Sequence, residues 1–470
     1  MRGRAPRIAE RLPCSERKGQ EILISARERL DKGSQLLQRH FATARRWILI
    51  LGLVASLIPS TTSSWAAETE SAAAAAPPPT SAPVRIYLDA SQSGGSRHAG
   101  LSIERGIRAA LATVGGTLGG REVELIVRDH RASTPRSRKH LREFAEDPNA
   151  LAIIAGMHSP PLLALKSFIN TSGLPVLVPW AAATPITRGE EPQNWIFRLS
   201  VDDAKAGFAI THFSVEQEGF RRPYLLLEDT GWGDSNLVTM TQSIKNSRAS
   251  LAGVGRFGWG MGETTAAELV EDAQQADADV LFLVANTEEG AAFARVVAEL
   301  DSEKRLPIRS HWGIAGGDFV GRIGKEALEK LDLSLIQTQV SLLSARTPLL
   351  ERALEIAARQ TPSLANAPRE MRAAPGFIHA FDLTLLLHQA ARGLPWSPDS
   401  DANRRWLREA LENIEGPVEG LVKTYRSPFT SPATGGADAH EALGLSDLTM
   451  GRFNADGLIE LDPDRVPAAD

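Results

Sequence analysis

The sequence has almost no cysteine. Its 470 residues contain a single one, Cys14, which lies ahead of an apolar run at Trp47–Ile58. No cysteine follows that run, so the rest of the chain is expected to have no disulfide, no thiol nucleophile and no thiolate metal site. The same absence excludes a lipid-modified cysteine anchor directly after the run.

Several enzyme motifs are also missing. The chain has no G-x-S-x-G nucleophile elbow, no P-loop and no H-E-x-x-H zinc motif. Its ten histidines are scattered, without the spacing of metal ligands. We therefore expect no metal site, no cofactor and no enzymatic activity.

Charge is distributed unevenly along the chain. Residues 1–66 hold 12 basic and 5 acidic side chains, which leaves 40 basic against 52 acidic in the remainder. An acidic body argues against nucleic acid as a partner.

The N-terminal segment has the order of a secretory signal. Two arginines precede the apolar run, and Ser64 and Ala66 stand at the −3 and −1 positions of a plausible cleavage site. The run is short for a membrane span, and a retained anchor is the alternative. Residues 67–83 are rich in alanine and proline, which indicates a linker. The sequence predicts a periplasmic protein.

From residue 84 onward, short apolar strands alternate with helical stretches. The strands read VRIYLD, VELIVRD, LAIIAG and PVLVP; a second series reads YLLLED, DVLFLV and LPIRS. Such alternation predicts an α/β protein with two doubly wound parallel-sheet lobes. The long helices after residue 347 are expected at 348–359 and 377–392.

The two series suggest how the chain is divided. We expect a first lobe of residues 84–201 and 339–418, and a second lobe of residues 202–338 and 419–470. A three-segment hinge would then join them near Val201–Asp203, Gln337–Ser341 and Pro417–Leu421. Ligands of open parallel sheets bind at the carboxyl ends of the strands, so the loops there are the candidate site.

The tetrapeptide Gly233-Asp234-Ser235-Asn236 resembles the nucleophile block of GDSL-type hydrolases. Those enzymes carry their base late in the chain as D-x-x-H, whereas Asp438 and His440 are only two residues apart. We interpret residues 231–233 as a pocket turn and residues 234–236 as the cap of the next helix. A secreted hydrolase that uses Ser235 is the alternative from another functional class.

The order of motifs is similar to a known family. GGREVELIVRD, IIAGMHSPP, GLPVLVPWAAATPIT, IFRLSVDD, LLLEDTGWGDSN, SHWGIAGGDF and GFIHAFDLTLLLHQA follow one another over residues 84–461. Together they resemble the type I periplasmic binding proteins of ABC transporters, the branched-chain amino acid and amide receptors. The resemblance implies the type I periplasmic binding fold, a small ligand held by hinge closure, and an ABC permease in the inner membrane as partner. A ligand sensor that signals to a membrane receptor is the alternative.

Amino-acid receptors of this family hold the ligand carboxylate with a serine, a threonine and backbone amides, and the ammonium with an acidic residue. Ser159 matches the serine, although it could simply cap the following helix. Ala181 and Ala182 stand where the hydroxyl is expected, unless Thr184 replaces it. Trp312 stands near the place of the acidic residue, so an ordinary α-amino acid is not the expected ligand.

Aromatic residues take the place of these polar groups. Trp180, Trp232 and Trp312 all fall in strand-end loops, which favours stacking on a flat or apolar ligand, with plain core packing as the alternative. The complete predicted ligand site comprises His158, Ser159, Trp180, Ala181, Ala182, Thr184, Trp232, Asn286, His311 and Trp312.

Overall fold

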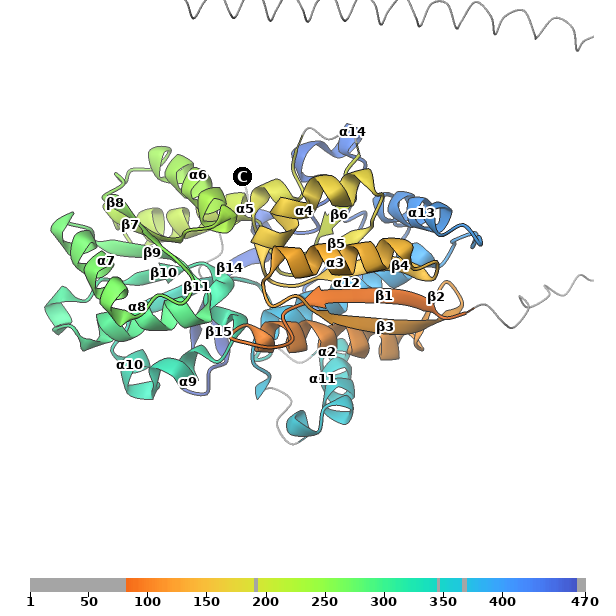
Figure 1. The fold of residues 1–470 in the computed structure, drawn as a ribbon. Coiled ribbons are helices and arrows are strands. Elements are labelled where there is room, and N and C mark those ends of the chain that lie inside the picture. Colours follow the sequence, from red (N-terminus) through yellow and green to blue (C-terminus); the bar gives the residue numbers. More distant parts are fainter. Residues whose placement is uncertain (1–81, 190–192, 345–346, 366–369, 463–470) are drawn as a thin grey trace, which may run out of the picture. The chain divides into compact units, whose positions relative to one another are not determined.

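The computed structural model describes residues 82–189, 193–344, 347–365 and 370–462. The predicted signal segment, nearly all of the predicted linker and the last eight residues lie outside the described residues. The described residues form two α/β lobes, each built around its own sheet (Figure 1). Among the helices of this part, none is long and apolar enough to cross a bilayer.

The first sheet is almost entirely parallel. Its strands, in spatial order, are β2 (Thr117–Leu118), β3 (Arg121–Asp129), β1 (Val84–Ala90), β4 (Ala150–Ala155), β5 (Val176–Val178) and β6 (Ile196–Arg198). Only the β2–β3 pair is antiparallel. Around the sheet lie α2 (Arg97–Thr113), α3 (Thr134–Glu146), α4 (Ser159–Thr171), α11 (Pro348–Gln360), α12 (Ala374–Ala391) and α13 (Ser400–Glu412). Every residue of β4, β5 and β6 is buried, as expected for parallel strands covered on both faces.

The second sheet repeats the plan with an antiparallel edge. Its order is β15 (Ile459–Leu461), β14 (Leu448–Phe453), β11 (Leu333–Thr338), β10 (Ile308–Ser310), β9 (Val280–Val284), β7 (Pro223–Glu228) and β8 (Gly253–Phe257). Strands β14 and β15 run antiparallel. Its helices are α5 (Asp203–His212), α6 (Gly231–Lys245), α7 (Glu263–Gln275), α8 (Thr287–Glu299), α9 (Phe319–Ile323) and α10 (Lys325–Glu329). The predicted fold class, two α/β lobes dominated by parallel strands, is confirmed.

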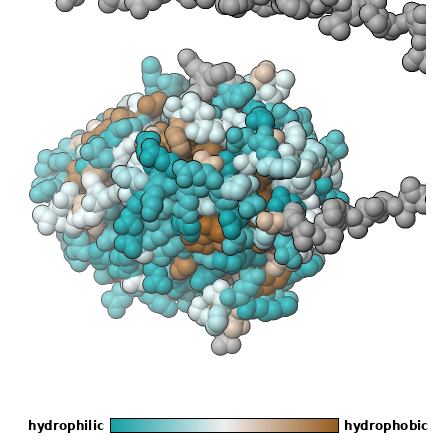
Figure 2. Space-filling view, turned by 45° about the vertical axis from the view of Figure 1, so that its right-hand side comes forward, coloured by the Kyte–Doolittle hydropathy of each residue, from teal (hydrophilic) through white to brown (hydrophobic). Residues whose placement is uncertain are grey.

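Most apolar side chains are buried, and the surface is mostly polar. Figure 2 shows one face of the molecule, where hydrophilic side chains dominate and apolar ones gather only in limited patches. The largest fully buried side chains include Trp180 and Trp312, and three arginines: Arg198, Arg309 and Arg404.

The chain passes from one sheet to the other three times, and the third passage differs from expectation. Strand β12 (Val418–Glu419) pairs with β13 (Thr424–Tyr425) beside α12 of the first lobe. The buried carboxylate of Asp382 accepts the backbone N–H of Leu421 at 2.5 Å. Further along, the backbone N–H of Arg198 in β6 donates to the carbonyl of His440. The chain therefore stays with the first lobe well past residue 419, and the expected crossing at Pro417–Leu421 is wrong.

Helix α6 begins earlier than expected. Thr230 is its N-cap, and the Thr230 hydroxyl accepts the backbone N–H of Trp232 at 3.3 Å. Residues 231–233 are thus the first helical turn, and residues 234–236 lie inside the helix, so the predicted pocket turn and cap are wrong. Gly233 permits this start because a Cβ there would lie 1.8 Å from the carbonyl oxygen of Glu228.

Candidate functional site: a cleft between the lobes

A cavity of about 160 Å³ lies between the two lobes. The first lobe contributes Gly95, Ser96, Ala132 and His158, and the second lobe Trp259, Gly260, Asn286, Thr287, Glu288 and Glu289. These residues follow the carboxyl ends of β1, β3, β4, β8 and β9. The cavity therefore occupies the position where open parallel sheets bind their ligands.

His158 forms the wall of this cavity on the first lobe. It occupies the N-cap position of α4, is 7% exposed, and places its Nε2 3.2 Å from the Ser96 hydroxyl. Burial, aided by the neighbouring His130, lowers the pKa of His158 to about 3, so the ring is neutral at physiological pH. Its Nδ1 has no hydrogen-bond partner among the described residues.

The second lobe supplies polar groups that are mainly acceptors. The Asn286 Nδ2 donates to Glu228 at 2.7 Å, and Glu289 accepts the backbone N–H of Gly260 at 2.8 Å. Burial raises the pKa of Glu228 to about 7, against the opposing hydrogen bonds from Trp259, Thr230 and Asn286. A buried carboxyl near neutrality, next to a cleft, is a common feature of functional sites.

The three predicted tryptophans converge, but they contact protein. The rings of Trp180 and Trp312 lie 5.3 Å apart, and Trp312 also lies 5.2 Å from His379. Trp232 donates its indole N–H to Asp203 at 3.1 Å. None of the three tryptophans lines the cavity described above. Their packing joins the lobes behind the cleft, and their stacking on a ligand stays a prediction.

His311 is held in one tautomer by its neighbours. Its Nδ1 accepts the backbone N–H of Trp312 at 2.9 Å, which places the proton on Nε2. That Nε2 lies 3.0 Å from Asp203 Oδ1, and both side chains are fully buried. His311 thus supports the interior of the second lobe and does not line the cavity.

The remaining predicted residues do not line the cavity; they are buried or bonded to neighbouring backbone. The Ser159 hydroxyl accepts the backbone N–H of Ala183 at 3.2 Å, and the Thr184 hydroxyl accepts that of Ala204 at 3.0 Å. Ala181 and Ala182 are buried. Ser159 is the first residue of α4 and not its N-cap, so the alternative that it caps this helix is wrong, and its contact with a ligand stays a prediction. Of the ten predicted residues, only His158 and Asn286 line the cavity.

Comparison with known proteins agrees with this architecture. The model of the family described as "Periplasmic binding protein" matches residues 83–434. The chain belongs to the periplasmic binding protein family. No curated protein matches the sequence.

Solved structures share the fold at low sequence identity. A type 1 periplasmic binding protein from Bordetella pertussis is 18% identical, with a TM-score of 0.67 over 81% of this chain and 100% of its own. A solute-binding protein from R. palustris in complex with benzoate is 15% identical, with a TM-score of 0.65 over 81% and 95%. A leucine-binding protein from Thermotoga maritima is 16% identical, with a TM-score of 0.64 over 81% and 99%.

The geometry around Ser235 does not resemble that of a hydrolase in this periplasmic binding protein. Its hydroxyl is buried in α6 and accepts the backbone N–H of Thr184 at 3.0 Å. No hydrogen bond between Ser235 and a histidine is present in the described part of the chain. The serine instead connects α6 to the loop after β5 and so contributes to the contact between the lobes.

Sequence reasoning missed the aromatic residue of the cleft. Trp259 is 45% exposed and lies 5.8 Å from the His158 ring, centroid to centroid. It follows β8, whose sequence GVGRF has two glycines and an arginine and so no continuous apolar run. Such a sequence gives a weak strand signal, so the sequence alone indicates neither the strand nor a site residue in the loop after it.

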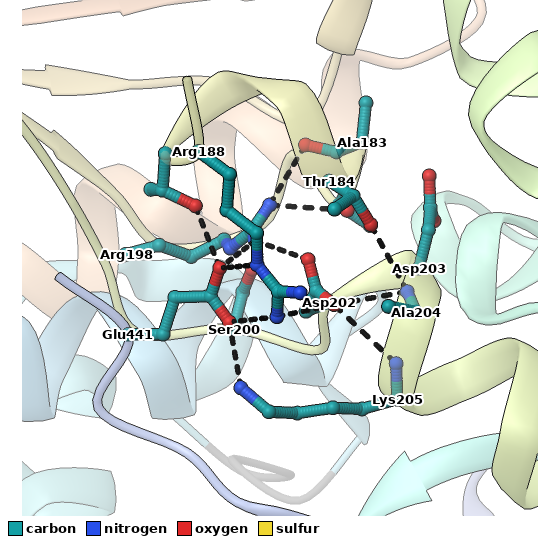
Figure 3. Close-up of polar contacts among 12 residues, drawn as sticks. Ala183, Thr184, Arg188, Arg198, Ser200, Asp202, Asp203, Ala204, Lys205 and Glu441 are labelled. Carbon is teal, nitrogen blue, oxygen red and sulfur yellow. Dashed lines mark hydrogen bonds and ion pairs between the residues drawn. The ribbon is translucent and has the colours of Figure 1, made fainter. Parts of the chain in front are cut away.

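A network of ion pairs and hydrogen bonds holds the loop that follows β5 (Figure 3). Arg198, which is fully buried, donates to the carbonyls of Ala182 and Ala183 at 3.0 and 2.9 Å and pairs with Asp202. Glu441 pairs with Arg198 at 2.8 Å. The network thereby joins the first passage between the lobes to the segment that precedes the third.

Proposed function

We propose that this protein is an extracytoplasmic solute-binding protein of an ABC-type importer. A small organic ligand would enter the cleft, and closure of the lobes about the crossover segments would bury it. The closed form would then be presented to a permease in the inner membrane. The single observation that carries this proposal is the cavity of about 160 Å³ lined by strand-end residues of both lobes.

We further propose that the ligand is not an ordinary α-amino acid. Solved relatives were crystallised with benzoate or are described as leucine-binding. In this chain, Pro160 and Pro161 have no N–H to offer a carboxylate at the start of α4. The Ser159 hydroxyl, which matches the family's carboxylate contact, accepts the Ala183 N–H, so its single O–H is the one donor that it could offer a carboxylate.

The test is native mass spectrometry of the chain from about Glu68, purified without refolding. We expect a bound small molecule that is released on denaturation, and that is absent from a Trp259→Ala variant. Calorimetry with leucine and glutamate is expected to detect no micromolar binding. An empty wild-type protein that no small solute stabilises against heat would contradict the receptor function, and micromolar binding of leucine would contradict the ligand class.

A further inference from the structure

We propose that the cleft binds a small organic cation, an amine with an apolar body and no carboxylate. This inference rests on the proposed function, since it names the ligand class of the same cleft. It follows from the chemistry of the cavity wall, where acceptors and carboxylates are not matched by cations.

The orientation of Asn286 sets the first part of the wall. Its Nδ2 donates to the Glu228 carboxylate at 2.7 Å, so its Oδ1 is turned away from Glu228. Asn286 lines the cavity, where its Oδ1 is an acceptor and one of its two Nδ2 N–H groups is already used by Glu228. An ammonium group, with three N–H donors, is the complement of such a wall.

Two carboxylates are the only charged side chains that line the cavity, among the residues that the structure describes. Glu289 is 4% exposed and uses Oε1 to accept the Gly260 N–H. Glu288 reaches across to the first lobe, since a Cβ built on Gly95 would lie 2.8 Å from its Oε2. No lysine or arginine is among the described residues that line this cavity.

Two arginines adjoin lining residues along the chain, but neither lines the cavity. Arg131 precedes Ala132, and its Nε pairs with Asp129 at 3.0 Å. Arg97 follows Ser96 and is exposed to solvent. His158 is neutral because of its burial. An anionic ligand would therefore face like charge without a counterion, which is unfavourable in a partly desolvated site.

The other side of the cavity suits an apolar body. Trp259 presents its half-exposed indole ring at the cavity, where an aromatic face attracts both apolar groups and cations. A second, independent observation points to a ligand here. His158 lines the cavity and is more than nine-tenths buried, and its Nδ1 has no partner among the described residues.

The experiment compares probes that differ only in charge. Benzylamine, benzyl alcohol and benzoate form one series, and butylamine, butanol and butanoate a second. Each is titrated into the full mature chain by calorimetry, with the thermal shift as a second readout. We expect the amine of at least one series to bind, and its carboxylate counterpart not to bind.

Two variants test the site itself, and a third serves as the control. Glu288→Gln and Glu289→Gln keep the shape of the side chain, and the amide oxygen introduced by Glu289→Gln can still accept the Gly260 N–H. Glu289→Gln is expected to weaken amine binding by about tenfold or more, because a buried carboxylate partner is lost. Glu288→Gln is expected to weaken it less, because Glu288 is exposed to solvent. Glu303→Gln, an exposed position, is the matched control and is expected to bind as the wild type does.

The outcomes separate this inference from the proposed function. Tighter binding of a carboxylate or alcohol than of its amine overturns the cation assignment while the receptor function stands. Equal amine binding in both cleft variants and the wild type also overturns it. If no amine binds at millimolar concentration, the assignment is overturned as well. Native mass spectrometry then shows whether the receptor function stands with another ligand class.

Discussion

Two groups of carboxylates in this protein have opposite surroundings. The crossover group, Asp202, Asp438 and Glu441, is paired with Arg188, Arg198 and Lys205. The cleft group, Glu228, Glu288 and Glu289, has no lysine or arginine partner in the ion pairs of the described residues. Basic side chains balance the charge of the first group, whereas the second group has no such partner and lies at or next to a cavity.

The pKa values of two glutamates express this difference. Burial alone would raise the pKa of Glu441, but the charge of Arg198 and the hydrogen bond from Arg188 outweigh it and hold the pKa well below its usual range. Burial raises the pKa of Glu228 to about 7, and the nearby charge of Glu289 adds to the shift. The comparison indicates that the crossover group stabilises the fold, and the unpaired cleft group supports the proposed ligand site.

The largest effect is expected from breaking the crossover group. Glu441→Ala leaves the fully buried Arg198 without one of its two carboxylate partners. We expect a loss of about 3–5 kcal/mol in the free energy of unfolding, as for other broken buried pairs, measured by denaturant titration. Asp438→Asn is the control, because the Asp438 side chain is 51% exposed, and its loss should stay below about 1 kcal/mol. Equal losses of unfolding free energy in the two variants would show that the buried and the exposed carboxylate contribute equally to stability.

A second prediction contrasts a tryptophan behind the cleft with the one inside it. Trp312→Ala removes a buried ring packed on Trp180 and is expected to cost about 3 kcal/mol or more of unfolding free energy. Trp259→Ala removes a half-exposed ring, so the expected stability loss is below about 1 kcal/mol, but ligand binding should fail. Unchanged affinity in Trp259→Ala, or affinity lost only in Trp312→Ala, would favour the tryptophan stack as the ligand site.

A third prediction concerns pH. Because the folded protein holds the Glu228 proton up to a pKa of about 7, against 4.5 for the free group, this residue favours folding at low pH. That contribution is lost as pH rises through the folded value. Glu228→Gln removes the dependence, so its stability relative to wild type should rise by roughly 2–3 kcal/mol between pH 5 and pH 8. A stability difference between variant and wild type that is constant with pH would show that the pKa of Glu228 is not raised in the folded protein.

The smallest effect is expected at Gly95. Its φ is not in the left-handed region, so Gly95→Ala strains no backbone, but the added Cβ meets the exposed Glu288 carboxylate. Stability should change by less than about 0.5 kcal/mol, as for most exposed substitutions, whereas amine affinity should fall measurably. Calorimetry and thermal unfolding of one sample distinguish the two effects, and unchanged affinity would place Glu288 outside the site.

The fold could be predicted because its signal is local. Runs such as LAIIAG and DVLFLV, each fully or almost fully buried, identify parallel strands by composition alone. The third passage between the lobes could not be predicted. Its position depends on long-range contacts, such as that of Asp382 with the backbone of Leu421, which leave no periodic pattern.

The residues that line the candidate site could be predicted only in part, for a related reason. His158 and Asn286 follow obvious strands, and the structure brings both to the cavity. Trp180 and Trp312 also follow strands. Whether such a ring faces a ligand or packs in the core depends on long-range contacts, and here the two rings contact each other. The glycine-rich β8 concealed Trp259 because strand propensity is weak in such a sequence.

The most direct test of the contrast between the two carboxylate groups is a carbon-13 NMR titration of the glutamate carboxyl groups. Glu228→Gln and Glu441→Gln variants would assign the two signals. We predict that Glu228 titrates near pH 7 in the ligand-free protein, while Glu441 stays ionised at about pH 4.3, where ordinary glutamates are half protonated. Ordinary values for both residues would contradict the proposed division into a compensated crossover group and an uncompensated cleft.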